Sequence, residues 1–98
     1  MAKSFSRIAL LVALIASGYD SYQAVEALSK IGPDAEDAVL TLLKEKHQET
    51  RRQGCVILRQ IGTKKSLDAL REMMLEPEYG PSSAASEAVR AIVARQTQ

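Results

Sequence analysis

The sequence is poor in aromatic residues and nearly free of cysteine. It has no tryptophan, one phenylalanine and three tyrosines, so alanine and the aliphatic residues supply most of its 46% hydrophobic content. That mixture favours helices over sheets, which are enriched in aromatic and β-branched residues. Cys55 is the only cysteine, so no internal disulfide can form and the fold must rest on packing, as is usual in reducing compartments. We therefore expect an all-α, cytoplasmic protein.

The chain also lacks an excess of charge of either sign. Thirteen basic and twelve acidic residues give a net charge of +1, and residues 1–32, 33–62 and 63–98 sum to +1, 0 and 0. A surface that binds nucleic acid needs clustered positive charge to displace counterions from phosphates, and an anionic membrane attracts the same feature. The charge balance supports neither a nucleic acid nor a membrane as the partner.

No apolar run is long enough to cross a bilayer. Residues 8–16 form a run of nine apolar residues, whereas a spanning helix needs about 20. With Lys3 and Arg7 ahead of it, this run also has the features of a secretory signal that would end near Ala16 or Gly18. We expect a buried first helix here. The alternative is an exported, envelope-associated protein in which residues 1–16 act as the signal.

An internal repeat of about thirty residues organises the chain. The pattern Leu-x-x-Ile-Gly at residues 28–32 returns at residues 58–62, and a looser third copy covers residues 85–92. Within each copy, apolar residues recur at spacings of three and four, which is the period of an amphipathic helix. Because a hairpin of two such helices cannot cover its own apolar face, the sequence predicts hairpins stacked in a row.

Glycine, proline and capping residues predict where the helices begin and end. Asp20 and Gln23 resemble a capping box at the start of the second helix, and Gly32 can supply the left-handed residue that ends it. Thr63 is the expected N-cap of the fifth helix, and Pro77 should stop that helix near residue 75. The helices are therefore expected at residues 4–17, 20–31, 33–46, 49–61, 63–75 and 84–95, with a turn at residues 80–83.

The hairpins resemble short bacterial HEAT-like repeats of the armadillo type. The resemblance rests on the Ile-Gly endings followed by Pro-Asp or Thr-Lys, covers nearly the whole chain, and is strongest over residues 24–43 and 54–74. It implies a right-handed α-solenoid of three antiparallel hairpins, six helices in all, that forms one domain over residues 1–98. That domain could belong to a longer protein.

HEAT-like proteins are mostly adaptors and scaffolds, so the resemblance implies a non-enzymatic, protein-binding module without a cofactor. Some relatives are bilin lyases or their partners, which leaves an accessory protein or lyase that acts on a prosthetic group as an alternative. A few HEAT-like folds are DNA glycosylases that use aromatic and acidic residues in a basic groove. The lack of tryptophan argues against that branch.

In the resembling family, the second helix of each hairpin lines the concave side of the solenoid. Outside the expected core stripe, polar residues of these helices stack in columns, and one column reads Ser29, Arg59 and Arg90. Arginine and tyrosine are common interface anchors, so we expect a protein or an acidic peptide as the partner. The predicted binding residues are Tyr22, Glu26, Arg52, Arg59, Gln60, Glu87 and Arg90. Alternatively, Arg59 and Arg90 only pair with Glu26 and Glu87.

The first helix is apolar around nearly its whole circumference over residues 8–15, although a terminal solenoid helix should have a polar outer face. We therefore expect another surface to cover it, either a second copy of the chain or a neighbouring domain, with a membrane interface as a further alternative. The residues predicted to mediate self-association are Phe5, Ile8, Leu11, Val12 and Ile15.

Other reactive or unusual residues have structural explanations. Gly54 and Cys55 occupy the repeat positions of small or apolar residues, so we expect close helix packing and a buried, inert thiol. His47 is the only histidine and falls in a predicted turn, and zinc would need more ligands than the chain offers. We expect no catalytic and no metal site, and we place three carboxylates on exposed helix faces: Glu36, Asp37 and Glu45.

Overall fold

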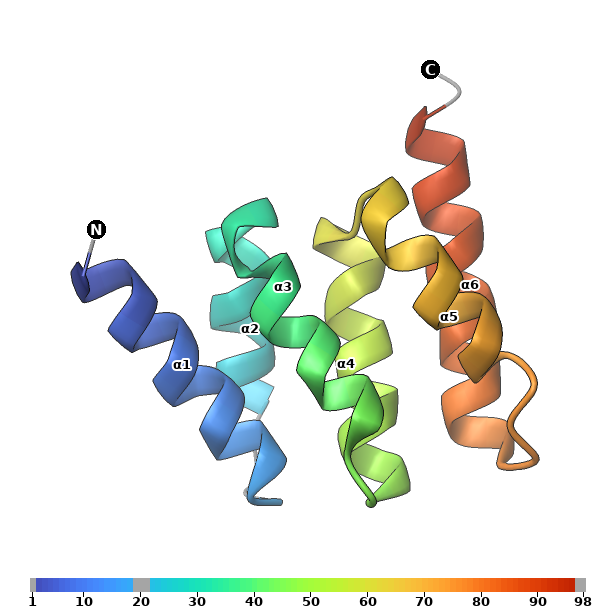
Figure 1. Ribbon diagram of the computed structural model, residues 1–98, viewed down its shortest axis with the longest axis horizontal. Coiled ribbons are helices and arrows are strands. Elements are labelled where there is room, and N and C mark those ends of the chain that lie inside the picture. Colours follow the sequence, from blue (N-terminus) through green and yellow to red (C-terminus); the bar gives the residue numbers. More distant parts are fainter. Residues whose placement is uncertain (1, 19–21, 97–98) are drawn as a thin grey trace.

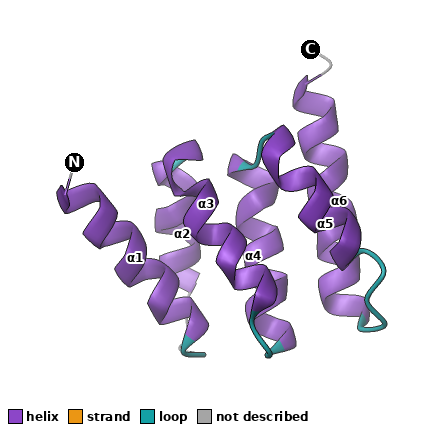
Figure 2. Cartoon of the chain, viewed as in Figure 1, coloured by secondary structure: helices purple, strands orange, loops and turns teal. Residues whose placement is uncertain are grey.

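The computed structural model describes residues 2–18 and 22–96, with side chains from residue 7 onward. Its helices are α1 (Ala2–Ala16), α2 (Tyr22–Ile31), α3 (Glu36–Leu40), α4 (Gln48–Ile61), α5 (Leu67–Met73) and α6 (Tyr79–Gln96). Three 3₁₀ turns extend the first helices of the second and third hairpins: η1 (Pro33–Ala35), η2 (Thr41–Lys44) and η3 (Lys64–Ser66). No strand occurs in these residues, as Figure 2 shows.

The six helices form three hairpins stacked side by side in two layers. Helices α1, α3 and α5 make the layer nearer the viewer in Figure 1, and α2, α4 and α6 lie behind them. The molecule measures 33 × 32 × 18 Å, and the short dimension fits two layers of helices, each about 10 Å thick. The all-α solenoid predicted from the repeat is therefore confirmed.

The core runs along the whole stack, between the two layers. Every described helix contributes to it, from Ile8 and Ile15 of α1 to Ile92 of α6. The side chains buried most completely include those of Leu28, Leu42, Ile57, Leu58 and Leu70, at the positions where the repeat places its apolar stripe. The stack therefore has one continuous apolar seam and needs no disulfide.

Two glycines allow helices to approach closely. A Cβ atom at Gly54 would lie 3.1 Å from both Leu42 Cβ and Leu43 Cδ2, so α4 packs directly against η2 of its own hairpin. A Cβ atom at Gly62 would lie 2.6 Å from Ile92 Cδ1 of the next hairpin. The close packing predicted for Gly54 is confirmed, but the contact lies within a hairpin and not between hairpins.

The predicted helix ends are mostly correct, with three differences. The helix predicted over residues 33–46 is divided into η1, α3 and η2 and ends at Lys44. Gly32 ends α2 with φ 88° and ψ −155°, so its φ is positive as predicted, but its ψ lies outside the left-handed helical region. The last helix begins at Tyr79 and not at residue 84. The predicted turn at residues 80–83 is wrong because Pro81 lies in the first turn of α6, where a missing N–H costs no helical hydrogen bond. Asp20 of the predicted capping box lies outside the described residues.

Candidate binding surface

The seven residues predicted to bind a partner all lie on the second helices α2, α4 and α6. Six of them are exposed, and Arg52 is half-buried. Two adjoining hollows, of about 370 and 420 Å³, lie between α4 and α6 and share Arg59 and Glu87. We call these two hollows together the α4–α6 groove. Its lining residues are Arg52, Val56, Arg59, Tyr79, Gly80, Ser83, Ala84, Glu87, Arg90 and Ala91.

The structure brings four of the seven predicted residues together in this groove and leaves the other three apart. Tyr22 and Glu26 lie on α2, where the Tyr22 hydroxyl donates a 3.5 Å hydrogen bond to Glu26 and Lys30 makes a 3.8 Å ion pair with the same carboxylate. Gln60 is exposed on α4 and lines neither hollow. The α4–α6 groove is therefore smaller than the surface expected from the sequence.

Three arginines give the α4–α6 groove its charge. Arg59 forms a 3.2 Å ion pair with Glu87, which joins the second and third hairpins. Arg52 donates two hydrogen bonds, of 2.8 and 2.7 Å, to Glu49, and these bonds lower the pKa of that carboxyl. Arg90 has no ion pair within the described residues. The expected alternative in which Glu26 neutralises one of these arginines does not occur, since Glu26 faces Lys30.

The structure adds an aromatic residue to the groove that the sequence prediction missed. Tyr79 is 82% exposed and lines the groove beside Arg52 and Arg59. It was missed because residues 80–83 were expected to be a turn, which would have left Tyr79 outside the last helix. The usable signal was Pro81, a residue that fits a first helical turn as well as it fits a loop.

A family comparison agrees with this architecture. Residues 8–92 match the family model described as HEAT repeats. The chain belongs to the HEAT-repeat family. HEAT repeats generally mediate protein–protein interactions and are typically non-catalytic scaffolds. Neither the curated proteins nor the solved structures include a significant match.

In this HEAT-repeat protein, two of the residues predicted to self-associate face inward. Ile8 and Ile15 belong to the core, at 6% and 1% exposure, so the prediction is corrected for these two residues. Leu11 and Val12 pack against the core and are half-buried. The large apolar side chains exposed on the described part of α1 are Leu10 and Leu14. The side chain of Phe5 lies outside the described residues.

A buried carboxylate links two consecutive HEAT repeats. Glu36 is 2% exposed, which corrects the expectation that it lies on an exposed face. It accepts hydrogen bonds from the Thr63 backbone N–H at 2.7 Å, the Thr63 hydroxyl at 2.9 Å and the Ser66 hydroxyl at 2.5 Å. Beside it, Lys65 forms a 2.9 Å ion pair with Asp37, and this hydrogen bond raises the pKa of the lysine. We call Glu36, Thr63 and Ser66 the Glu36 latch.

Arg51 makes a second link between repeats. Its guanidinium donates to the backbone carbonyls of Glu45 and Lys46 at 2.8 and 2.7 Å, and it reaches the carboxylates of Glu76 and Glu78 at 3.1 and 3.2 Å. Its side chain is only 12% exposed. Arg51 therefore ties the loop before α4 to the loop before α6. The sequence prediction did not single it out.

Cys55 and His47, the only cysteine and the only histidine in the sequence, do not line the α4–α6 groove. Cys55 is fully buried, and burial raises the pKa of its thiol to about 12, as expected for an inert cysteine. His47 precedes α4 and is exposed. Among the described residues there is no cluster of three or more potential metal ligands, and no helix is long and apolar enough to span a membrane.

Proposed function

We propose that this HEAT-repeat protein binds an acidic peptide, or an acidic segment of a larger protein, in the α4–α6 groove. The observation that carries the proposal is that two adjoining hollows meet at Arg59: Arg52 and the exposed aromatic residue Tyr79 line one of them, and Arg90 lines the other. Arginine and tyrosine are the residue types that most often anchor protein interfaces.

Ligand carboxylates can compete for these arginines at low cost. The pair of Arg59 and Glu87 has side-chain exposures of 54% and 49%, and ion pairs so exposed contribute only about 0–1 kcal/mol. Arg90 makes no ion pair among the described residues, although Glu87 lines the same hollow. An incoming carboxylate would therefore break only a weak ion pair at Arg59 and none at Arg90.

The groove is also a rigid platform. Helices α4 and α6 make the most extensive contact between elements in the described chain. Near the end of α4, Arg95 of α6 donates 2.7 Å hydrogen bonds to the backbone carbonyls of both Arg59 and Gly62. Because both walls are fixed before binding, a ligand would not have to order them, which favours affinity.

The test is a binding titration with fluorescent peptides of matched length that are acidic, neutral or basic. We expect the acidic peptide to bind best, and we expect its affinity to fall with added salt because exposed charges are screened. Arg90→Glu and the double variant Arg59→Glu/Arg90→Glu should weaken binding about tenfold or more. Arg71→Glu is the matched control, since Arg71 is an exposed arginine of α5, in the other layer.

Two results would overturn the proposal. One is undiminished binding by the double variant while its helical circular dichroism matches the wild type. The other is an equal loss of binding in Arg71→Glu, which would indicate a general charge effect and not a groove.

A further inference from the structure

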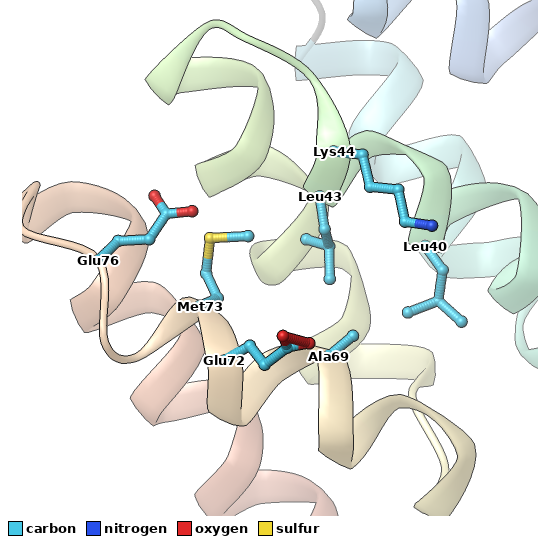
Figure 3. Close-up of a pocket in the computed structure, with 7 residues that line it drawn as sticks. All are labelled: Leu40, Leu43, Lys44, Ala69, Glu72, Met73 and Glu76. Carbon is cyan, nitrogen blue, oxygen red and sulfur yellow. The ribbon is translucent and has the colours of Figure 1, made fainter.

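A larger hollow, of about 570 Å³, lies on the opposite layer, between η2 and α5. Figure 3 shows the apolar side chains of Leu40, Leu43 and Met73 around its centre, with Lys44 and Glu76 at opposite ends. Ala69 and Glu72 complete the lining. We call this hollow the first-helix groove. Its volume lies within the range of about 300–1,000 Å³ typical of ligand pockets.

The two carboxylates that line the first-helix groove differ in whether they already form an ion pair. Glu76 is held by Arg51 at 3.1 Å. Glu72 is exposed and has no ion pair within the part of the chain that the structure describes. The first-helix groove therefore offers an apolar floor and a free carboxylate, so it suits a helix that carries apolar anchors and a cation.

The outer face of α1 has these properties. Leu10 is 62% exposed and Leu14 is 38% exposed, and residues four apart lie on the same side of a helix. Arg7 lies three residues before Leu10 and is also exposed. The sequence of α1 contains two cations, Lys3 and Arg7, and no acidic residue. Nothing in the described chain covers Leu10.

We propose that the first-helix groove binds the outer face of α1 from a second copy of this chain. Leu10 and Leu14 fill the apolar floor, and Arg7 approaches Glu72. This is the helix-in-groove mode of recognition, in which apolar residues at i and i+4 act as anchors. The proposal does not depend on the α4–α6 groove, which lies in the other layer.

The contact joins two different surfaces, a helix face of one copy and a groove of the other. In a two-fold pair each copy's helix enters the other's groove and association stops at the dimer, whereas a head-to-tail arrangement leaves one helix face and one groove unused and grows into rings or open chains. A symmetric pairing of two α1 helices would also stop at the dimer. Mixing variants distinguishes that pairing from a helix bound in a groove.

The experiment measures the mass of the full chain by sedimentation velocity over a wide concentration range. We expect the wild type to associate into dimers or larger assemblies. Leu10→Asp removes an anchor and Glu72→Arg places a cation opposite Arg7, so each variant alone should associate roughly tenfold or more weakly. Asp68→Arg is the control, because it makes the same charge change at an exposed position of α5 that does not line the groove.

The decisive sample is an equimolar mixture of Leu10→Asp and Glu72→Arg. The first variant keeps an intact groove and the second keeps an intact α1 face, so the mixture should form heterodimers that cannot grow. A wild type that stays monomeric at high concentration would overturn the proposal. So would normal self-association of Glu72→Arg, or a mixture that remains monomeric, provided that circular dichroism shows both variants folded.

Discussion

The Glu36 latch gives the sharpest test of how consecutive repeats are held together. Glu36→Ala removes a carboxylate that accepts from two residues of the next repeat, Thr63 and Ser66. Ser66 is fully buried, so its hydroxyl loses its partner and water does not replace it. Thr63 is half-buried and regains water more easily. The loss should therefore destabilise the whole stack and not only one loop.

The expected size follows from these contacts. A hydrogen bond to a charged group contributes about 1.5–3 kcal/mol, and a buried hydroxyl left unsatisfied costs about 1–3 kcal/mol. Glu36→Ala also removes the free-energy cost of burying a charged carboxylate, and this gain offsets part of the loss. We therefore expect Glu36→Ala to lower the free energy of unfolding by about 3 kcal/mol and Glu36→Gln, which keeps the shape and one acceptor oxygen, by about 1–2 kcal/mol.

The assay is urea unfolding followed by far-ultraviolet circular dichroism. In a domain of this size, each kcal/mol also shifts the melting temperature by roughly 4–8 °C. Asp34→Ala is the control, because Asp34 is an exposed carboxylate at the same helix start and has no latch contact. If Glu36→Ala and Asp34→Ala unfold within about 0.5 kcal/mol of each other, the latch does not couple the repeats.

Three further predictions concern other positions. Gly32→Ala and Gly32→Asn should be about equally destabilising, by roughly 1–3 kcal/mol in denaturation, because the φ and ψ of Gly32 suit glycine alone. Gly62→Ala should cost a similar amount, because its Cβ would clash with the backbone carbonyl of Leu58 in α4 and with Ile92 of α6. Cys55 should react with a thiol reagent only after unfolding. Its thiol has a pKa of about 12 in the folded chain and an ordinary value of 9.0, so between these pH values the unfolded chain loses the proton more readily. The free energy of unfolding should therefore hold below about pH 9 and fall between pH 9 and 12. Arg51→Ala should lower the free energy of unfolding by about 2–3 kcal/mol. Arg52→Ala loses an exposed ion pair within one helix and should change it by about 0.5 kcal/mol or less. Equal effects of the two substitutions would contradict the role of Arg51 as a link between repeats.

The fold was predictable because the repeat and its apolar spacing leave one way to bury the seam. Leu28 and Leu58 recur at matching positions of the repeat, and both are fully buried in the structure. The N-cap at Thr63 was equally readable, and its hydroxyl accepts from the Lys65 backbone N–H at 3.3 Å. These features are local or periodic, so they can be predicted from a single sequence.

The features that the sequence did not reveal depend on which surface meets which neighbour. Glu36 is a polar residue on the apolar stripe of its helix, three residues before Val39, and its burial is explained only by donors that lie 27 and 30 residues later. The inward and outward faces of α1 could not be separated because both are apolar. In the structure, packing determines which face of α1 points inward: Ile15 is buried and Leu10 is exposed.

The Glu36 latch and Arg51 give the stack its geometry as well as part of its stability. The Glu36 latch joins the start of α3 to the turn that follows α4, and Arg51 joins the loops that precede α4 and α6, so two consecutive hairpins are tied at both ends. Apolar contacts alone permit sliding, because leucine and isoleucine side chains can repack in several ways, whereas hydrogen bonds to fixed donors permit one register. That register sets the spacing of Arg59 and Arg90 across the α4–α6 groove. Weakening the Glu36 latch should therefore weaken binding of an acidic peptide, even though neither Glu36 nor Arg51 lines the α4–α6 groove. If the folded Glu36→Gln variant binds the peptide with unchanged affinity, the groove holds its shape without the intact latch.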